Sequence, residues 1–90
     1  MYFVYMIKNS YGNLYIGITD NPERRLKEHN TKRGAGFTKN RDEFKIVFLE
    51  NHNSLKEARS REIQIKKWRR DKKEKLIELY SQNISTKLQL

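Results

Sequence analysis

Two tyrosines stand ten residues apart near the start of the chain, in segments that predict a pair of strands. Tyr5 and Tyr15 lie on either side of the turn-forming residues 9–13, in stretches rich in β-branched and aromatic side chains. In such a hairpin they are opposite or diagonal neighbours, about 5 to 8 Å apart, so two phenols would share one face. Ordinary strand aromatics would also explain the pair. Gly17, however, indicates that backbone or ligand approaches the second strand closely.

Arg25 and His29 are four residues apart in a segment that predicts a helix. Asp20, Pro22 and Glu23 give this helix a typical start. Side chains at this spacing share a face. An arginine and a histidine side by side do not stabilise each other, but together they can bind an anion such as phosphate. A solvated basic face is the simpler alternative.

Glu62 is a carboxylate within an otherwise apolar stripe of a second, longer predicted helix. Leu55, Ala58 and Ile65 form the rest of this stripe at helical spacing. A carboxylate buried there is costly unless it is paired or binds metal. The sequence therefore leaves two interpretations open. Glu62 pairs with a base such as Arg25, or it binds a hard cation such as Mg²⁺.

The composition predicts a polyanionic partner. The chain of 90 residues carries 20 Lys and Arg against 11 Asp and Glu, a net charge of +9. This excess favours nucleic acid over a membrane. The candidate nucleic-acid-binding residues are Lys32, Arg33, Lys39, Arg61, Lys66, Lys67, Arg69 and Arg70. Trp68 lies among them, as a core residue or as a platform for one base.

The hydrophobic periodicity predicts a single α+β domain of order β-β-α-β-α-α, a small three-stranded antiparallel sheet flanked by helices. We expect the domain to span residues 1–80, followed by a frayed C-terminal tail over 81–90. The predicted strands are 2–8, 14–19 and 44–50. The predicted helices run from 22 to about 30, from 55 to about 70, and from 71 to about 80, with a basic loop over 31–42. Ser54 with Glu57, and Asp71 with Glu74, form capping-box patterns that predict the starts of the last two helices.

Several classes of protein are excluded by what the sequence lacks. There is no cysteine, which excludes disulfides, thiol catalysis and cysteine-based zinc sites. The longest apolar run, Tyr2–Ile7, is far shorter than the roughly 20 residues of a membrane span. The N-terminus has no signal-peptide pattern, so we expect a cytoplasmic protein.

The motifs together resemble the GIY-YIG nuclease superfamily. The resemblance rests on Val4-Tyr5, on Tyr15-Ile16-Gly17, on Arg25 and on Glu62 within the segment 61–68. It covers residues 2 to about 80 and is greatest to small, stand-alone, single-domain members. The chain is also similar to the nuclease domain of the bacterial excision-repair nuclease.

The resemblance implies hydrolysis of nucleic-acid phosphodiesters with one Mg²⁺ or Mn²⁺ ion. The residues that match family positions are Tyr5 and Tyr15, the motif tyrosines; Gly17, the motif glycine; Arg25; His29, found in some branches; and Glu62, the metal ligand. Two positions depart from the pattern. Phe3-Val4-Tyr5 replaces Gly-Ile-Tyr, and Ile18 stands where the excision-repair nuclease has a lysine.

In the implied mechanism Glu62 holds the metal and Arg25 stabilises the developing negative charge. Tyr5 is our preferred proton acceptor with Tyr15 as its partner, although the sequence does not decide between the tyrosines. His29 would assist proton transfer or hold a phosphate. We expect DNA rather than RNA as substrate, with a second copy or a protein partner supplying specificity.

Two other function classes compete with the nuclease. One is a nucleic-acid-binding module of the same fold with little or no catalysis. The other is a small basic scaffold without chemistry. A carboxylate within an apolar stripe argues against the scaffold, which gains nothing from it.

Overall fold

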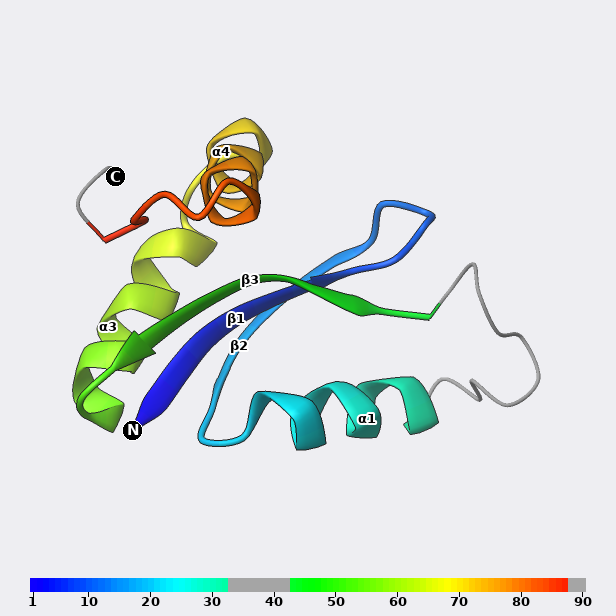
Figure 1. Cartoon of the computed structure of the whole chain (residues 1–90), viewed down its shortest axis with the longest axis horizontal. Coiled ribbons are helices and arrows are strands. Elements are labelled where there is room, and N and C mark those ends of the chain that lie inside the picture. The colour runs from blue at the N-terminus through cyan, green and yellow to red at the C-terminus, as the bar shows by residue number, and fades with distance from the viewer. Residues whose placement is uncertain (33–42, 88–90) are drawn as a thin grey trace.

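A computed structural model describes residues 1–32 and 43–87 of the chain (Figure 1). It contains a three-stranded antiparallel sheet of order β2-β1-β3 and confirms the predicted fold class and element order. The strands are β1 (Tyr2–Lys8), β2 (Leu14–Thr19) and β3 (Lys45–His52), and the helices are α1 (Pro22–Lys32), α3 (Leu55–Lys66) and α4 (Arg70–Ser81).

The register of the hairpin decides how the two tyrosines meet. Tyr5 pairs with Gly17, and Ile7 pairs with Tyr15, so the tyrosines are diagonal neighbours, as predicted. A tight turn closes the hairpin, with the left-handed Gly12 (φ 85°) donating its N–H to the Asn9 carbonyl. The central strand β1 also pairs with β3, which leaves one side of β2 as a free edge of the sheet.

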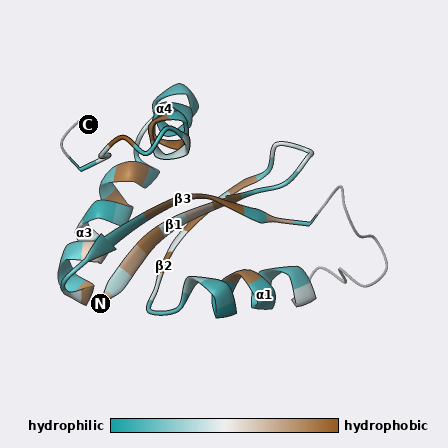
Figure 2. Cartoon of the chain, viewed as in Figure 1, coloured by the Kyte–Doolittle hydropathy of each residue, from teal (hydrophilic) through white to brown (hydrophobic). Residues whose placement is uncertain are grey.

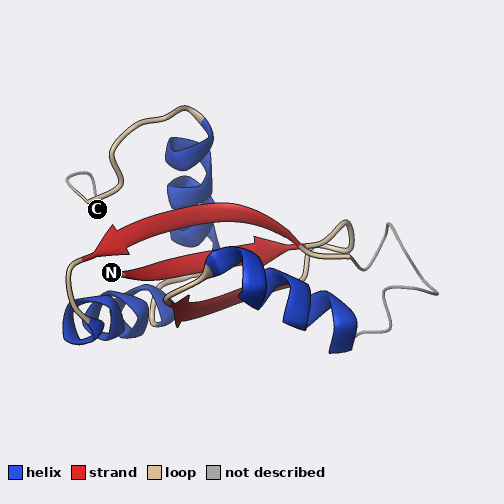
Figure 3. Cartoon of the chain, turned by 60° about the horizontal axis from the view of Figure 1, so that its bottom comes forward, coloured by secondary structure: helices blue, strands red, loops and turns tan. Residues whose placement is uncertain are grey.

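The alternation of side chains along β1 separates the two faces of the sheet. Val4 and Met6 pack with α3 and α4 in one buried cluster. Tyr5 and Ile7 pack with Phe44 and with residues of α1 in a second cluster. Hydrophobic residues therefore concentrate in the strands, between helices whose outer turns are hydrophilic (Figure 2). The helix α1 crosses the face opposite to that of α3 and α4 (Figure 3).

The helix ends confirm one predicted cap and correct two others. The Ser54 hydroxyl accepts the Glu57 N–H at 3.2 Å and caps α3, as predicted. At α1, the cap is Asn21, whose side-chain oxygen accepts the Arg24 N–H at 3.1 Å. Asp20 instead pairs with the Arg24 guanidinium. The first position of α4 is Arg70, so Asp71 does not cap that helix.

Several element boundaries also differ from the prediction, among them β3, which is Lys45–His52 rather than 44–50. The helix α3 ends at Lys66, earlier than expected, and α1 extends through Lys32 into the predicted loop. The rest of that loop, with Arg33 and Lys39, lies outside the described residues. The described residues after α4, 82–87, are anchored rather than frayed, because Thr86 is 7% exposed and its hydroxyl donates to Glu50 at 2.6 Å.

Glu50 is the centre of a buried polar cluster on β3. Arg61 of α3 donates to both of its carboxylate oxygens, at 2.8 and 3.3 Å. His52 contacts the same carboxylate at 2.9 Å. Burial raises the pKa of the Glu50 carboxyl, but the hydrogen bonds of Arg61 and Thr86 and the charge of Arg61 outweigh it. The pKa is therefore held below its usual range.

Within residues 1–32 and 43–87, no helix has the length and apolar character needed to cross a membrane.

Candidate active site

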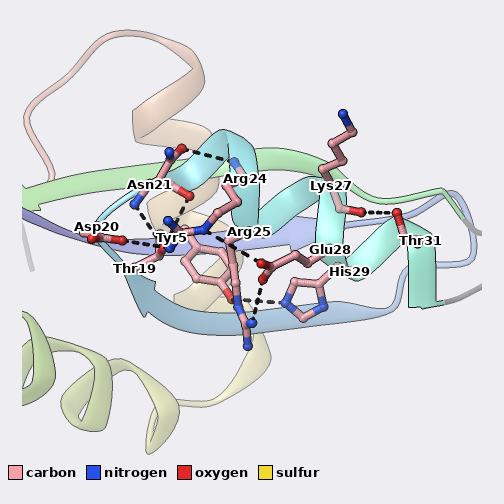
Figure 4. Close-up of polar contacts among 10 residues, drawn as sticks. All are labelled: Tyr5, Thr19, Asp20, Asn21, Arg24, Arg25, Lys27, Glu28, His29 and Thr31. Carbon is pink, nitrogen blue, oxygen red and sulfur yellow. Dashed lines mark hydrogen bonds and ion pairs between the residues drawn. The ribbon is translucent and has the colours of Figure 1, made fainter.

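The Tyr5 hydroxyl is the centre of a polar cluster between β1 and α1 (Figure 4). Arg25 donates its Nε–H to this oxygen at 3.3 Å, and His29 Nε2 lies 3.1 Å from it. Arg25 and His29 are one turn apart on α1, so the predicted shared face exists and points at the sheet. The Tyr5 hydroxyl thus accepts from Arg25 and shares a second hydrogen bond with His29 Nε2.

Gly17 makes room for this arrangement. It lies opposite Tyr5, and a Cβ at this position would stand 2.6 Å from the Tyr5 hydroxyl oxygen and 2.9 Å from two ring carbons. Real Cβ contacts are not this short, so any larger residue would push the phenol away from Arg25 and His29. The close approach to Gly17 is therefore made by the Tyr5 side chain, rather than by backbone or a ligand as predicted.

Tyr15 presents the second phenol at the surface. It is 54% exposed, whereas Tyr5 is 3% exposed. Its ring packs against His29, with centroids 4.8 Å apart, and edge-on to Phe44 at 6.4 Å. His29 is thus in contact with both tyrosines, one buried and one open to solvent.

Arg25 carries a positive charge held firmly in place beside the phenol. Besides its bond to Tyr5, its Nη1 donates to Glu28 at 3.1 Å. The hydrogen bond to Tyr5 raises the pKa of the Arg25 guanidinium, and the bond to Glu28 adds to this effect. The guanidinium therefore stays protonated and can stabilise charge on a phosphate.

Glu62 lies at the border of the α3 stripe rather than at its centre. The buried residues of α3 are Ala58, Arg61 and Ile65. The Glu62 side chain remains 12% exposed, and Lys66 Nζ pairs with it at 3.1 Å. Of the two interpretations of this carboxylate, pairing is thus present, but the base is Lys66 rather than Arg25.

A groove around the free edge of β2 connects α1 with α3. Its volume is about 370 Å³. It is lined by Tyr2, Ile18, Thr19, Asp20, Arg24, Arg25, Glu28, Leu55 and Arg59. Leu55 and Arg59 line the groove from α3, and Glu62 follows Arg59 by three residues on the same helix face, beyond the lining residues. Residues from opposite faces of the sheet share the groove because, within residues 1–32 and 43–87, no strand pairs with this edge of β2.

The donors present fit one particular kind of metal site. No group of three His, Asp or Glu residues within the described part of the chain could form a complete cage. Mg²⁺ at phosphoryl-transfer sites is commonly held by one or two carboxylates, with substrate phosphate and water completing its shell. The Glu62 carboxylate fits such a shared site, since its neighbour Lys66 is half exposed and can swing away.

The predicted basic residues separate into different environments. Arg61 is 9% exposed and bound to Glu50, so it belongs to the interior rather than to the basic surface. Lys66 pairs with Glu62, and Arg70 pairs with Glu74. Lys67 and Arg69 are exposed where α3 meets α4, on the other side of the sheet from α1 (Figure 1). Lys32 is in α1.

Trp68 packs partly buried against the larger hydrophobic cluster, so it serves as a core residue. Lys72 Nζ lies 4.2 Å from its ring centroid, which places a cation over the indole. Base stacking on this ring would have to displace that lysine.

Four residues at the site were not predicted from the sequence. Glu28 had a usable signal, because it stands three residues after Arg25 on the same helix. Leu55 was expected in the core but is 42% exposed in the groove. Arg24 and Arg59 are two of many arginines, and nothing in the sequence distinguishes those that line the groove.

Comparison with known proteins identifies the domain. Residues 1–75 match the family model of the GIY-YIG catalytic domain. The chain belongs to the GIY-YIG family. A GIY-YIG domain implies a nuclease-type activity and contact with nucleic acid, and this domain is a single small one.

Relatives of this GIY-YIG chain occur in different bacteria. A UPF0213 protein of Clostridium perfringens is 43% identical over 77 residues, which cover 86% of this chain and 83% of the relative. A UPF0213 protein of Syntrophus aciditrophicus is 47% identical over 76 residues, covering 83% and 87%. The solution NMR structure of UPF0213 protein BH0048 from Bacillus halodurans is similar, with a TM-score of 0.57 and 34% identity. That match covers 99% of this chain and 98% of the other.

Proposed function

We propose that this protein is a divalent-metal-dependent endonuclease that hydrolyses phosphodiester bonds of DNA. The proposal is carried by one observation: within a GIY-YIG catalytic domain, a buried phenol is hydrogen-bonded to both an arginine and a histidine. The choice of DNA rests on the resemblance to the excision-repair nuclease domain. The net charge of +9 is consistent with a polyanionic substrate.

Tyr5 and His29 act in this proposal as the proton-accepting pair. The Tyr5 hydroxyl takes the proton of the attacking water as its own proton passes to His29 Nε2, 3.1 Å away. A phenol is by itself a weak base at neutral pH. Arg25 donates to the Tyr5 oxygen at 3.3 Å and so orients the phenol, and His29 receives the displaced proton.

Arg25 also stabilises the charge that develops on the phosphoryl oxygens. Its Nε holds the phenol and its Nη1 holds Glu28, so the guanidinium plane is oriented before substrate binds. Tyr15, half exposed beside His29, is the phenol that can hydrogen-bond to the phosphate itself. Tyr5 and Tyr15 therefore have different roles, one in proton transfer and the other in substrate contact.

Glu62 would hold the single Mg²⁺ or Mn²⁺ ion, together with the substrate phosphate. When bound, such an ion neutralises phosphoryl charge and stabilises the leaving oxygen. The position of Glu62 on α3, three residues after Arg59 of the groove that Arg25 also lines, supports this role.

A cleavage assay tests the proposal. Labelled single-stranded, duplex and branched DNA and RNA are incubated with Mg²⁺, Mn²⁺ or EDTA. The wild type is compared with Glu62→Gln and with the control Glu78→Gln, whose carboxylate is exposed on α4. We expect metal-dependent cutting of DNA that Glu62→Gln loses and Glu78→Gln keeps.

Other outcomes would contradict separate parts of the proposal. Cutting by Glu62→Gln at the wild-type rate would exclude the metal-ligand role. Cutting of RNA alone would replace DNA as substrate. Salt-sensitive binding without cutting under any metal would identify a nucleic-acid-binding module instead.

A further inference from the structure

The groove around the edge of β2 contains one cation that neighbouring side chains do not compensate. Of its three arginines, Arg24 pairs with Asp20 at 2.9 Å, and Arg25 pairs with Glu28 at 3.1 Å. Arg59 is exposed on α3 and forms no ion pair with the part of the chain that the structure describes. Its guanidinium is therefore available to an anion that enters the groove.

Apolar surface lies directly beside this cation. Leu55 is one turn before Arg59 on α3. Its side chain is 42% exposed, although α3 packs on the sheet and a leucine would usually be buried there. Tyr2 and Ile18 line the same groove from β1 and β2. A guanidinium next to apolar and aromatic side chains suits a ligand that has both a phosphate and a flat, weakly polar ring.

The groove shares Arg25 with the Tyr5 cluster. A nucleic-acid strand whose phosphate is bound at Arg25 can therefore place its next sugar and base in this groove. At about 370 Å³ the groove is near the lower limit of ligand pockets and has room for about one nucleotide.

We propose that this groove is the binding site for the nucleotide adjoining the scissile phosphate. Arg59 binds the next phosphate along the strand, and Leu55 and Tyr2 contact the base and sugar. This inference rests on the proposed nuclease function and adds its substrate-positioning residues. Arg59 touches substrate but not the reacting atoms, so it contributes to binding rather than to the chemical step.

The binding test uses the dinucleotide pTpT as probe, added to isotopically labelled protein and followed by NMR. We expect the Leu55 methyl and Arg59 Nε–H signals to shift together and to saturate. Arg59→Ala should raise the Kd of pTpT about tenfold, the effect of losing one charge-assisted hydrogen bond. The control Lys56→Ala removes an exposed cation from the same helix, but one that lines a different hollow, and should change the Kd less than about twofold.

Both variants are exposed helix positions replaced by alanine, so they should fold, and the same spectra verify this. Shifts confined to other surface residues, equal effects of Arg59→Ala and Lys56→Ala, or no saturable binding would each overturn the inference.

Cleavage kinetics separate this inference from the proposed function. With a labelled oligonucleotide, Arg59→Ala should raise KM about tenfold and leave kcat within about twofold. The reason is that the lost contact stabilises the bound substrate and the transition state equally. Glu62→Gln should lose kcat and keep the affinity for pTpT. If Glu62→Gln cuts normally while Arg59→Ala weakens binding, the metal role fails and the nucleotide site stands. If Glu62→Gln is inactive while Arg59→Ala changes neither Kd nor KM, the nucleotide site fails alone.

Discussion

Gly17 lies directly opposite Tyr5, at the one position of β2 where a Cβ would stand 2.6 Å from the Tyr5 hydroxyl oxygen. The glycine leaves the space that the phenol needs to reach Arg25 and His29 on α1. The backbone of one strand therefore determines the position of a side chain on the next. This relationship links the hairpin register to the chemistry of the site.

Replacement of Gly17 by alanine should impair activity more than stability. The added methyl group displaces the end of the Tyr5 side chain, which can rotate, so both of its hydrogen bonds are lost. We expect kcat to fall at least about 100-fold, the usual contribution of a positioned proton acceptor. The control is Gly12→Ala, where nothing lies within 4 Å but φ is +85°. That change should cost about 1 to 2 kcal/mol of stability and leave kcat intact. A kcat reduced equally in both variants would contradict the positioning role.

Tyr5→Phe should remove the proton-accepting group while keeping the ring in its packed position. We expect kcat to fall about 100-fold or more, with the Kd for oligonucleotide unchanged within about twofold. Tyr15→Phe should instead raise KM, because this phenol is half exposed and contacts substrate in our proposal. Tyr11→Phe, on an exposed tyrosine of the hairpin turn, is the matched control. Retention of wild-type kcat by Tyr5→Phe would exclude it as the base.

Lys66→Ala should lower the metal concentration needed for activity. Lys66 Nζ forms an ion pair with the Glu62 carboxylate at 3.1 Å. The Lys66 side chain is 54% exposed, so this ion pair is weak and screened by solvent. Its loss should reduce the half-saturating Mg²⁺ concentration about twofold, from the few tenths of a kcal/mol typical of such helical pairs. The control Lys75→Ala removes a lysine paired with Glu78 on α4 and should leave the metal titration unchanged. An unchanged titration for Lys66→Ala would argue against Glu62 as the ligand.

Glu50→Ala should be strongly destabilising. The carboxylate is 2% exposed and its partner Arg61 is 9% exposed, so the mutation removes the opposite charge from a buried guanidinium. Breaking such a pair typically costs about 3 to 5 kcal/mol. Urea unfolding measures this loss, with Glu78→Ala, an exposed pair, expected to cost less than about 1 kcal/mol. A loss for Glu50→Ala as small as that of the control would show that the cluster is not needed for stability.

The same carboxylate should make stability depend on pH in the acid range. The folded pKa of Glu50 is below its usual value, so its stabilising contribution is complete above about pH 5 and disappears as the pH falls through the folded pKa. Glu74, held by Arg70 and Lys8, has its pKa shifted in the same direction, but it is more exposed and more screened. Between pH 7 and 3, the free energy of unfolding should therefore depend less on pH in Glu50→Gln than in Glu74→Gln. If Glu74→Gln reduced this pH dependence as much as Glu50→Gln or more, Glu50 would not be the main source of the acid sensitivity.

The sequence predicted the part of the site that depends on local periodicity. Strand alternation brought Tyr5 and Tyr15 to one face, and helical spacing brought Arg25 and His29 together. The strands β1 and β2 have the predicted bounds because a turn of polar residues separates two runs of β-branched and aromatic side chains.

Sequence could not predict which charges of α3 turn inward. The centre of its buried face passes through Ala58, Arg61 and Ile65, so Glu62 lies at the border. This rotation depends on Glu50, a strand residue 11 positions earlier that supplies a partner for Arg61. A pair between a strand and a helix leaves no periodic signal, and Arg61 therefore resembled the surface arginines around it.

The cluster around Glu50 also has a consequence for the order in which the chain folds during synthesis. Arg61 follows Glu50 by 11 residues, but Thr86 follows it by 36. A nascent chain that has emerged through α3 can neutralise the carboxylate, yet it lacks the hydroxyl and backbone carbonyl with which Thr86 completes the cluster. The buried polar cluster is therefore complete only after the segment that follows α4 has left the ribosome.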